Sequence, residues 1–209
     1  MIRKVLAFTL AETLIVMGII GIVSALTLPN LNSSTGEKEK VAKVKKIYQN
    51  LDDAYGRARA VYGPLEEWFI TTTNDDDKAE IFMERVTEFM KISKKTNNYI
   101  YILADGTEIY CRGDVSNGGE IVIQIEIDID GPNKGKNQLG IDIFNFNVRT
   151  SGVLPGDNLS GDDRLRYCFG GRYCTDWVIM NDNMDYLKAD SNGKCPNAKQ
   201  LSWTNISCK

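Results

Sequence analysis

The chain has 209 residues, a formal net charge of −3 and a sequence pI near 5.2, values that do not indicate a general nucleic-acid-binding protein. Hydrophobic residues make up 43% of it and charged residues 25%, which is ordinary for one globular domain with appendages. The chain contains no histidine, which excludes Ser-His-Asp and Cys-His catalysis and histidine-ligated zinc sites. We therefore expect no enzymatic activity.

The N-terminal segment combines a short basic leader with a long apolar run. Met1–Ala7 carries an arginine and a lysine, and residues 8–28 contain a single charged side chain, Glu12. A helix over this run spans about 30 Å, the thickness of a bilayer's hydrocarbon core. Positive charge before the run predicts a cytoplasmic N-terminus and an exported body. Pro29 predicts a kink or a stop, because proline removes a helix hydrogen bond.

Helical periodicity resumes after a polar joint at residues 30–36. Apolar side chains recur there every three or four positions: Val41, Val44, Tyr48, Leu51, Tyr55, Ala58 and Tyr62. This stripe predicts a helix with one face on a hydrophobic core, and we expect the charged run Glu37–Lys46 to face solvent. A second, shorter amphipathic helix is predicted after the acids at 75–77.

From Tyr99 the period becomes two, which is typical of strands. Residues 99–111 predict a hairpin that turns at Asp105-Gly106, and residues 121–129 and 141–148 predict further strands. The expected fold class is α+β. A long N-terminal helix, transmembrane in its first half and amphipathic in its second, packs on an antiparallel sheet of about four strands, followed by a cysteine-bearing C-terminal tail.

The chain has five cysteines and no CxxC pair, which argues against zinc ribbons and thioredoxin-type redox sites. In an exported body, disulfides are expected among four of them: Cys168, Cys174, Cys195 and Cys208. Their connectivity cannot be deduced from the sequence, and the fifth cysteine is left over or bridges to another chain. Five reduced, mostly buried thiols are the alternative.

The loop between the last two predicted strands is rich in oxygen donors. Its candidate calcium ligands are Asp128, Asp130, Asn133 and Asp142, because calcium binds about six to eight oxygens. The EF-hand pattern is not met. The alternative, which we favour, is a hairpin loop whose aspartates cap backbone N–H groups. We therefore expect no cofactor, with calcium as the one candidate.

The run Ala7-Phe8-Thr9-Leu10-Ala11-Glu12 and the apolar stretch after it resemble the N-terminus of type IV pilins and type II secretion pseudopilins. The resemblance implies a pilin-like fold, cleavage by prepilin peptidase between Ala7 and Phe8, and N-methylation of Phe8. Ala7 stands where the family usually has glycine. Glu12 corresponds to a glutamate thought to meet the N-terminal amine of a neighbouring subunit during assembly. Pro29 corresponds to a proline that loosens the helix.

The resemblance also implies a division of the chain into four parts. These are a leader peptide at 1–7, a transmembrane and assembly helix at 8–29, its amphipathic continuation at 30–62, and an exported α+β domain at 63–209. The implied localisation is a single pass through the cytoplasmic (inner) membrane with the N-terminus inside, and then an extracytoplasmic filament or the cell surface.

The function implied by the resemblance is that of a structural subunit of a type IV pilus or type II secretion-type filament, polymerising through its N-terminal helix. The implied partners are copies of itself, other pilins or pseudopilins, prepilin peptidase, the inner-membrane assembly platform and the membrane. A minor pilin that primes assembly or takes up DNA is an alternative, and only that one would bind nucleic acid. A membrane-anchored exported binding domain that never polymerises is another. The third alternative is an ordinary secretion signal cleaved after Val23-Ser24-Ala25. The charged Glu12 inside the apolar run argues against it.

Overall fold

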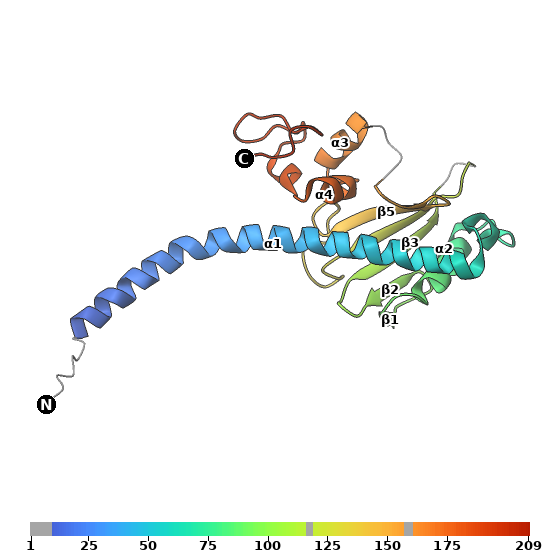
Figure 1. The fold of residues 1–209 in the computed structure, drawn as a ribbon, viewed down its shortest axis with the longest axis horizontal. Coiled ribbons are helices and arrows are strands. Elements are labelled where there is room, and N and C mark those ends of the chain that lie inside the picture. The colour runs from blue at the N-terminus through green and yellow to red at the C-terminus, as the bar shows by residue number, and fades with distance from the viewer. Residues whose placement is uncertain (1–9, 116–118, 157–160) are drawn as a thin grey trace, which may run out of the picture. The chain divides into compact units, whose positions relative to one another are not determined.

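The computed structural model describes residues 10–115, 119–156 and 161–209, with the side chains of all of them except 24–35 and 162. The chain forms two compact units, Met1–Glu39 and Lys40–Lys209. Helix α1, Leu10–Tyr62, contains the described part of the first unit and the beginning of the second. Figure 1 shows the elements of the fold along the chain.

The prediction of a membrane-spanning first half of this helix is wrong. None of the helices in the described ranges is long and apolar enough to cross a membrane. The predicted single pass through the cytoplasmic membrane required residues 8–29 to span the bilayer. Since the span is not found, the predicted single pass is wrong as well.

Six strands form one antiparallel sheet in the order of the sequence, so the sheet is a meander (Figure 1). They are β1 Ile92–Lys95, β2 Ile100–Leu103, β3 Glu108–Asp114, β4 Ile123–Asp128, β5 Ile143–Arg149 and β6 Gly152–Pro155. The prediction of about four strands is wrong because both edge strands are short and lack alternation: β1 reads ISKK and β6 reads GVLP. The architecture is α+β.

Shorter helices flank this sheet. They are η1 Leu65–Phe69, α2 Asp75–Thr87, α3 Gly161–Phe169, α4 Thr175–Asn181 and η2 Asp185–Lys188. Helix α2 begins where its sequence predicts, because the Asn74 side chain accepts a hydrogen bond from the Asp76 N–H at 2.9 Å. Packing of α2 requires a glycine on β3, since a Cβ on Gly113 would overlap the Asp75 carbonyl.

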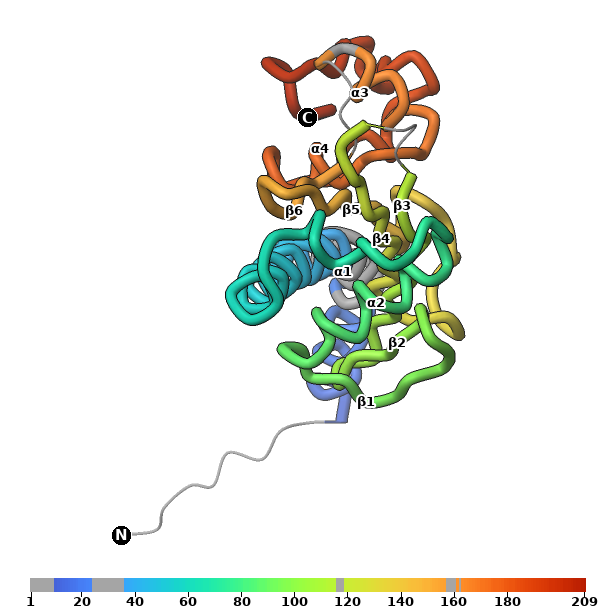
Figure 2. Tube along the Cα trace, turned by 90° about the vertical axis from the view of Figure 1, so that its right-hand side faces the viewer, coloured from blue at the N-terminus to red at the C-terminus, as the bar shows by residue number. Residues whose placement is uncertain are grey.

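The core of the second unit lies between one face of the sheet and α1. The part of α1 that follows Lys40 runs along the sheet (Figure 1 and Figure 2). The stripe predicted for this part is confirmed: Val44, Leu51 and Ala58 are at most 1% exposed. Tyr48 stacks on Phe146 of β5, with ring centroids 6.0 Å apart. Each large apolar side chain buried in this way contributes about 1.5–3 kcal/mol.

Candidate functional site

The predicted cleavage and methylation site, Ala7-Phe8, lies outside the described residues and stays a prediction. Helix α1 continues through Pro29, so this proline does not end the helix. The loosening of the helix that the resemblance implies there also stays a prediction.

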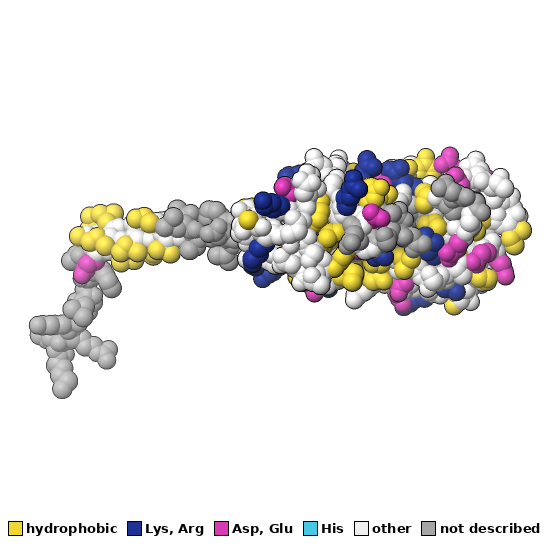
Figure 3. All heavy atoms as spheres, turned by 90° about the horizontal axis from the view of Figure 1, so that it is seen from above, with side chains coloured by type: hydrophobic (Ala, Val, Ile, Leu, Met, Phe, Trp, Pro, Cys, Tyr) yellow, Lys and Arg dark blue, Asp and Glu magenta, His cyan; other side chains and the backbone are white. Residues whose placement is uncertain are grey.

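The start of α1 carries apolar side chains on all its sides. Four consecutive residues there, positions 14–17, are between 51% and 67% exposed, and successive residues of a helix point about 100° apart. The other large exposed apolar side chains of this stretch are Leu10, Ile19, Ile20, Ile22 and Val23. Figure 3 shows hydrophobic side chains gathered along this stretch. A helix that is hydrophobic all round is normally buried, so its cover must come from outside the described residues of this chain.

Glu12 lies in the first turn of α1. A carboxylate at this end of a helix interacts favourably with the helix dipole, by about 0.3–1 kcal/mol when it is exposed. The role of Glu12 in assembly, which the resemblance implies, stays a prediction.

Asp142 closes the loop between β4 and β5. It is fully buried, and its Oδ2 accepts hydrogen bonds from the N–H groups of Lys136 and Asn137, while Oδ1 accepts one from Gln138 at 2.6 Å. The chain wraps closely around the carboxylate: a Cβ on Gly135 would overlap Asp142 Oδ2. Both oxygens are therefore occupied by backbone donors, as expected for a capping aspartate.

Asp130 binds two lysines of α1. The ammonium of Lys40 lies 3.4 Å from its Oδ2 and that of Lys43 lies 3.6 Å from its Oδ1. The same ammonium groups donate to the carbonyls of Ile141 and Ile129, each at 3.2 Å. Two cations of the chain itself thus occupy the carboxylate and carbonyl oxygens at this side of the loop. They fasten the loop to the helix.

Among the described residues, the calcium candidates do not belong to a metal-ligating group of side chains. Oδ1 of Asp128 accepts hydrogen bonds from the N–H groups of Asp130 and Gly131, at 3.1 and 2.9 Å, and Asn133 is exposed. Among the described residues there is no group of three or more His, Cys, Asp or Glu side chains that could hold a metal ion. The lysine contacts were missed by the sequence analysis, which assigned the run Glu37–Lys46 to solvent.

Disulfides connect Cys168 with Cys174 and Cys195 with Cys208, which confirms the four cysteines expected to form bridges. Structural disulfides persist in oxidising compartments, so they favour an exported location for the body. The fifth cysteine, Cys111 of β3, is a free and buried thiol. Burial raises its pKa to about 12, and the thiol is therefore neutral and unreactive in the folded protein.

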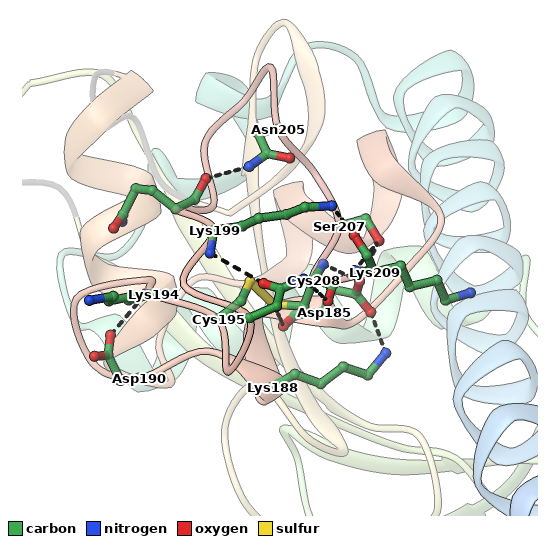
Figure 4. Close-up of a disulfide and its surroundings, with 12 residues drawn as sticks. Asp185, Lys188, Asp190, Lys194, Cys195, Lys199, Asn205, Ser207, Cys208 and Lys209 are labelled. Carbon is green, nitrogen blue, oxygen red and sulfur yellow. Dashed lines mark hydrogen bonds and ion pairs between the residues drawn. A yellow bond between two sulfur atoms is a disulfide. The ribbon is translucent and has the colours of Figure 1, made fainter.

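Asp185 holds the C-terminal tail beside the second disulfide (Figure 4). It is 3% exposed, and its Oδ2 accepts hydrogen bonds from the Ser207 hydroxyl at 2.9 Å and the Cys208 N–H at 2.8 Å. Its Oδ1 pairs with the ammonium of Lys188. The carboxylate and the disulfide therefore hold the last residues at the same point.

Acid is expected to loosen this tail. Burial raises the pKa of Asp185, but Lys188, the Cys208 N–H and the Ser207 hydroxyl outweigh it, so the pKa lies below the ordinary value of 3.8. Ionised Asp185 thus stabilises the fold above the unfolded pKa, and this contribution is lost as the pH falls below it. We expect the melting temperature of the wild type to fall more steeply between about pH 5 and pH 3 than that of Asp185→Asn. Equal slopes would contradict this role.

A cleft of about 440 Å³ lies between α1 and residues 89–91 and 103–105. Four of its five charged side chains pair with one another: Lys46 with Asp105 at 3.2 Å, and Arg57 with Asp53 at 3.1 Å. Its lining contains no serine, threonine or cysteine. The cleft therefore offers no hydroxyl or thiol nucleophile.

Comparisons of the chain with models of protein families, with curated proteins and with solved structures found no match. The function proposed below is therefore argued from the residues of this chain.

Proposed function

We propose that the protein is a structural subunit of a filament of the type IV pilus or type II secretion kind, with no catalytic activity of its own. Subunits pack through the first part of α1. The observation that supports this most directly is the exposure of apolar side chains on every side of this helix, from Leu10 to Val23.

Copies of the same helix can cover one another. Fully burying one large apolar side chain contributes about 1.5–3 kcal/mol, so several of them yield on the order of 10 kcal/mol before the cost of association. Because the apolar surface goes round the whole helix, one copy can contact neighbours on several sides. Contacts that repeat without closing a ring generate a helical filament.

Glu12 would set the register between subunits. Removal of the leader creates an ammonium on Phe8, and each new subunit brings its own carboxylate at Glu12. Such a pair adds little net stability when buried, whereas leaving one member alone is costly, by about 3–5 kcal/mol. Apolar packing would then supply the affinity between subunits, and the charge pair would fix how neighbouring helices are aligned.

The second unit has the properties expected of an exported body. Its two disulfides suit an oxidising compartment, and its loop between β4 and β5 is fastened to α1 by two lysines. In the filament this unit would supply the surface, while the helices supply the contacts.

Mass spectrometry of the protein recovered from producing cells tests this proposal. We expect the mature chain to begin at Phe8 and to carry a methyl group on its amine. A chain that retains Met1, or one that begins at Leu26 after an ordinary signal cleavage, would contradict it.

A further inference from the structure

A pocket of about 240 Å³ opens on the face of the sheet opposite to α1. Glu108 of β3 pairs with Asp128 of β4, and Tyr110 pairs with Glu126, so these four side chains share one face. The alternate residues of β3 and β4 point into the core. These four side chains line the pocket together with Ile100, Pro132, Asn137 and Ile143. It therefore combines three carboxylates with an aromatic ring and apolar side chains.

Two of these carboxylates face each other without a cation. Glu108 and Asp128 are directly opposite in the register, where like charges are destabilising. Asp128 is 6% exposed; its Oδ1 accepts two backbone hydrogen bonds, whereas within the described ranges its Oδ2 accepts none. Burial, and after it the neighbouring charge, raises the pKa of Glu108, and burial likewise raises the pKa of Asp128.

The third carboxylate of the pocket, Glu126, already has a cation of the chain as its partner. The Arg112 guanidinium lies 2.6 Å from Glu126 Oε1, and its central carbon is 5.6 Å from the centroid of the Tyr110 ring. No such cation lies at Glu108 and Asp128 within the part of the chain that the structure describes. Among the described residues, no ion pair joins either acid to a lysine or an arginine, Lys134 and Lys136 of the adjoining loop included.

We propose that this pocket binds an alkylammonium group, the ammonium seated between Glu108 and Asp128 and its apolar stem lying against Ile100 and Ile143. A lysine side chain of a peptide and a free primary amine share this chemistry. The apolar lining suits an organic cation better than a metal ion, for which the described residues offer no ligand set. The proposal is independent of filament assembly.

Thermal unfolding of the full-length protein tests the site. In about 100 mM n-butylammonium chloride we expect a melting temperature about 3 °C above that in sodium chloride of equal ionic strength. Without ligand, Glu108→Gln should melt no lower than the wild type, because the repulsion between Glu108 and Asp128 is removed. In n-butylammonium chloride it should not show the rise in melting temperature. Glu84→Gln, an exposed acid of α2 outside the pocket, is the matched control and should keep it.

The outcomes separate the sources of the ligand. A larger gain with Nα-acetyl-lysine amide than with n-butylammonium assigns the ammonium to a peptide side chain, and equal gains assign it to a free amine. Equal responses of the wild type and Glu108→Gln to n-butylammonium would overturn the proposal. So would a gain in calcium chloride as large as that in the amine.

Discussion

Replacing Asp142 by alanine lowers the free energy of unfolding by about 3–5 kcal/mol, because three backbone donors lose their common acceptor. These are the N–H groups of Lys136, Asn137 and Gln138. A hydrogen bond to a charged group contributes about 1.5–3 kcal/mol, and a buried donor left alone costs a similar amount. Urea unfolding followed by tryptophan fluorescence measures the change.

Asp130→Ala is the matched control for this prediction, because it removes an acid of the same loop. Its carboxylate is 23% exposed and is held by Lys40 and Lys43, so we expect a loss of about 1 kcal/mol or less. Equal losses in the two variants would show that Asp142 does not organise the loop.

Glu12→Ala is expected to reduce incorporation into filaments at least tenfold while leaving the melting temperature of the body unchanged. If the amine on Phe8 is buried beside a neighbour, loss of Glu12 leaves a charge unpaired at a cost of about 3–5 kcal/mol, more than a hundredfold in the contact equilibrium. The measurement is the fraction of protein that pellets after filaments are sheared from cells. Glu39→Ala, an exposed acid of the same helix, should pellet like the wild type. Wild-type pelleting by Glu12→Ala would remove the proposed role of the acid.

The parts of the fold that depend on local periodicity could be predicted from the sequence. The stripe of α1 and the central strands β3 to β5 are examples, because they repeat a pattern over several residues. The edge strands β1 and β6 could not be predicted, since four residues such as ISKK carry no alternation. Neither could α3 and α4, which lie in a tail rich in glycine and aspartate. The membrane span was predicted from the composition of residues 8–28 alone, and none of the helices in the described ranges is long and apolar enough to cross a membrane.

The sites depend on contacts that the sequence does not contain. Lys40 and Lys43 bind carbonyls 101 and 86 residues away, so their charges looked like those of a solvated helix face. The opposition of Glu108 and Asp128 depends on strand register, and a shift of one residue would move either side chain to the other face. The cysteines were easier to predict, because their number and position in an exported chain favour bridges.

A single introduced cysteine can test whether copies of α1 cover one another. Four native cysteines form disulfides and Cys111 is buried, so Val16→Cys would carry the one reactive thiol. Ile70→Cys, at a body position that is 78% exposed, is the control. With a short bismaleimide on sheared filaments, we predict covalent dimers for Val16→Cys and few for Ile70→Cys. If Val16→Cys reacts with a monofunctional maleimide in the same filaments but stays monomeric with the cross-linker, subunits do not pack through this helix.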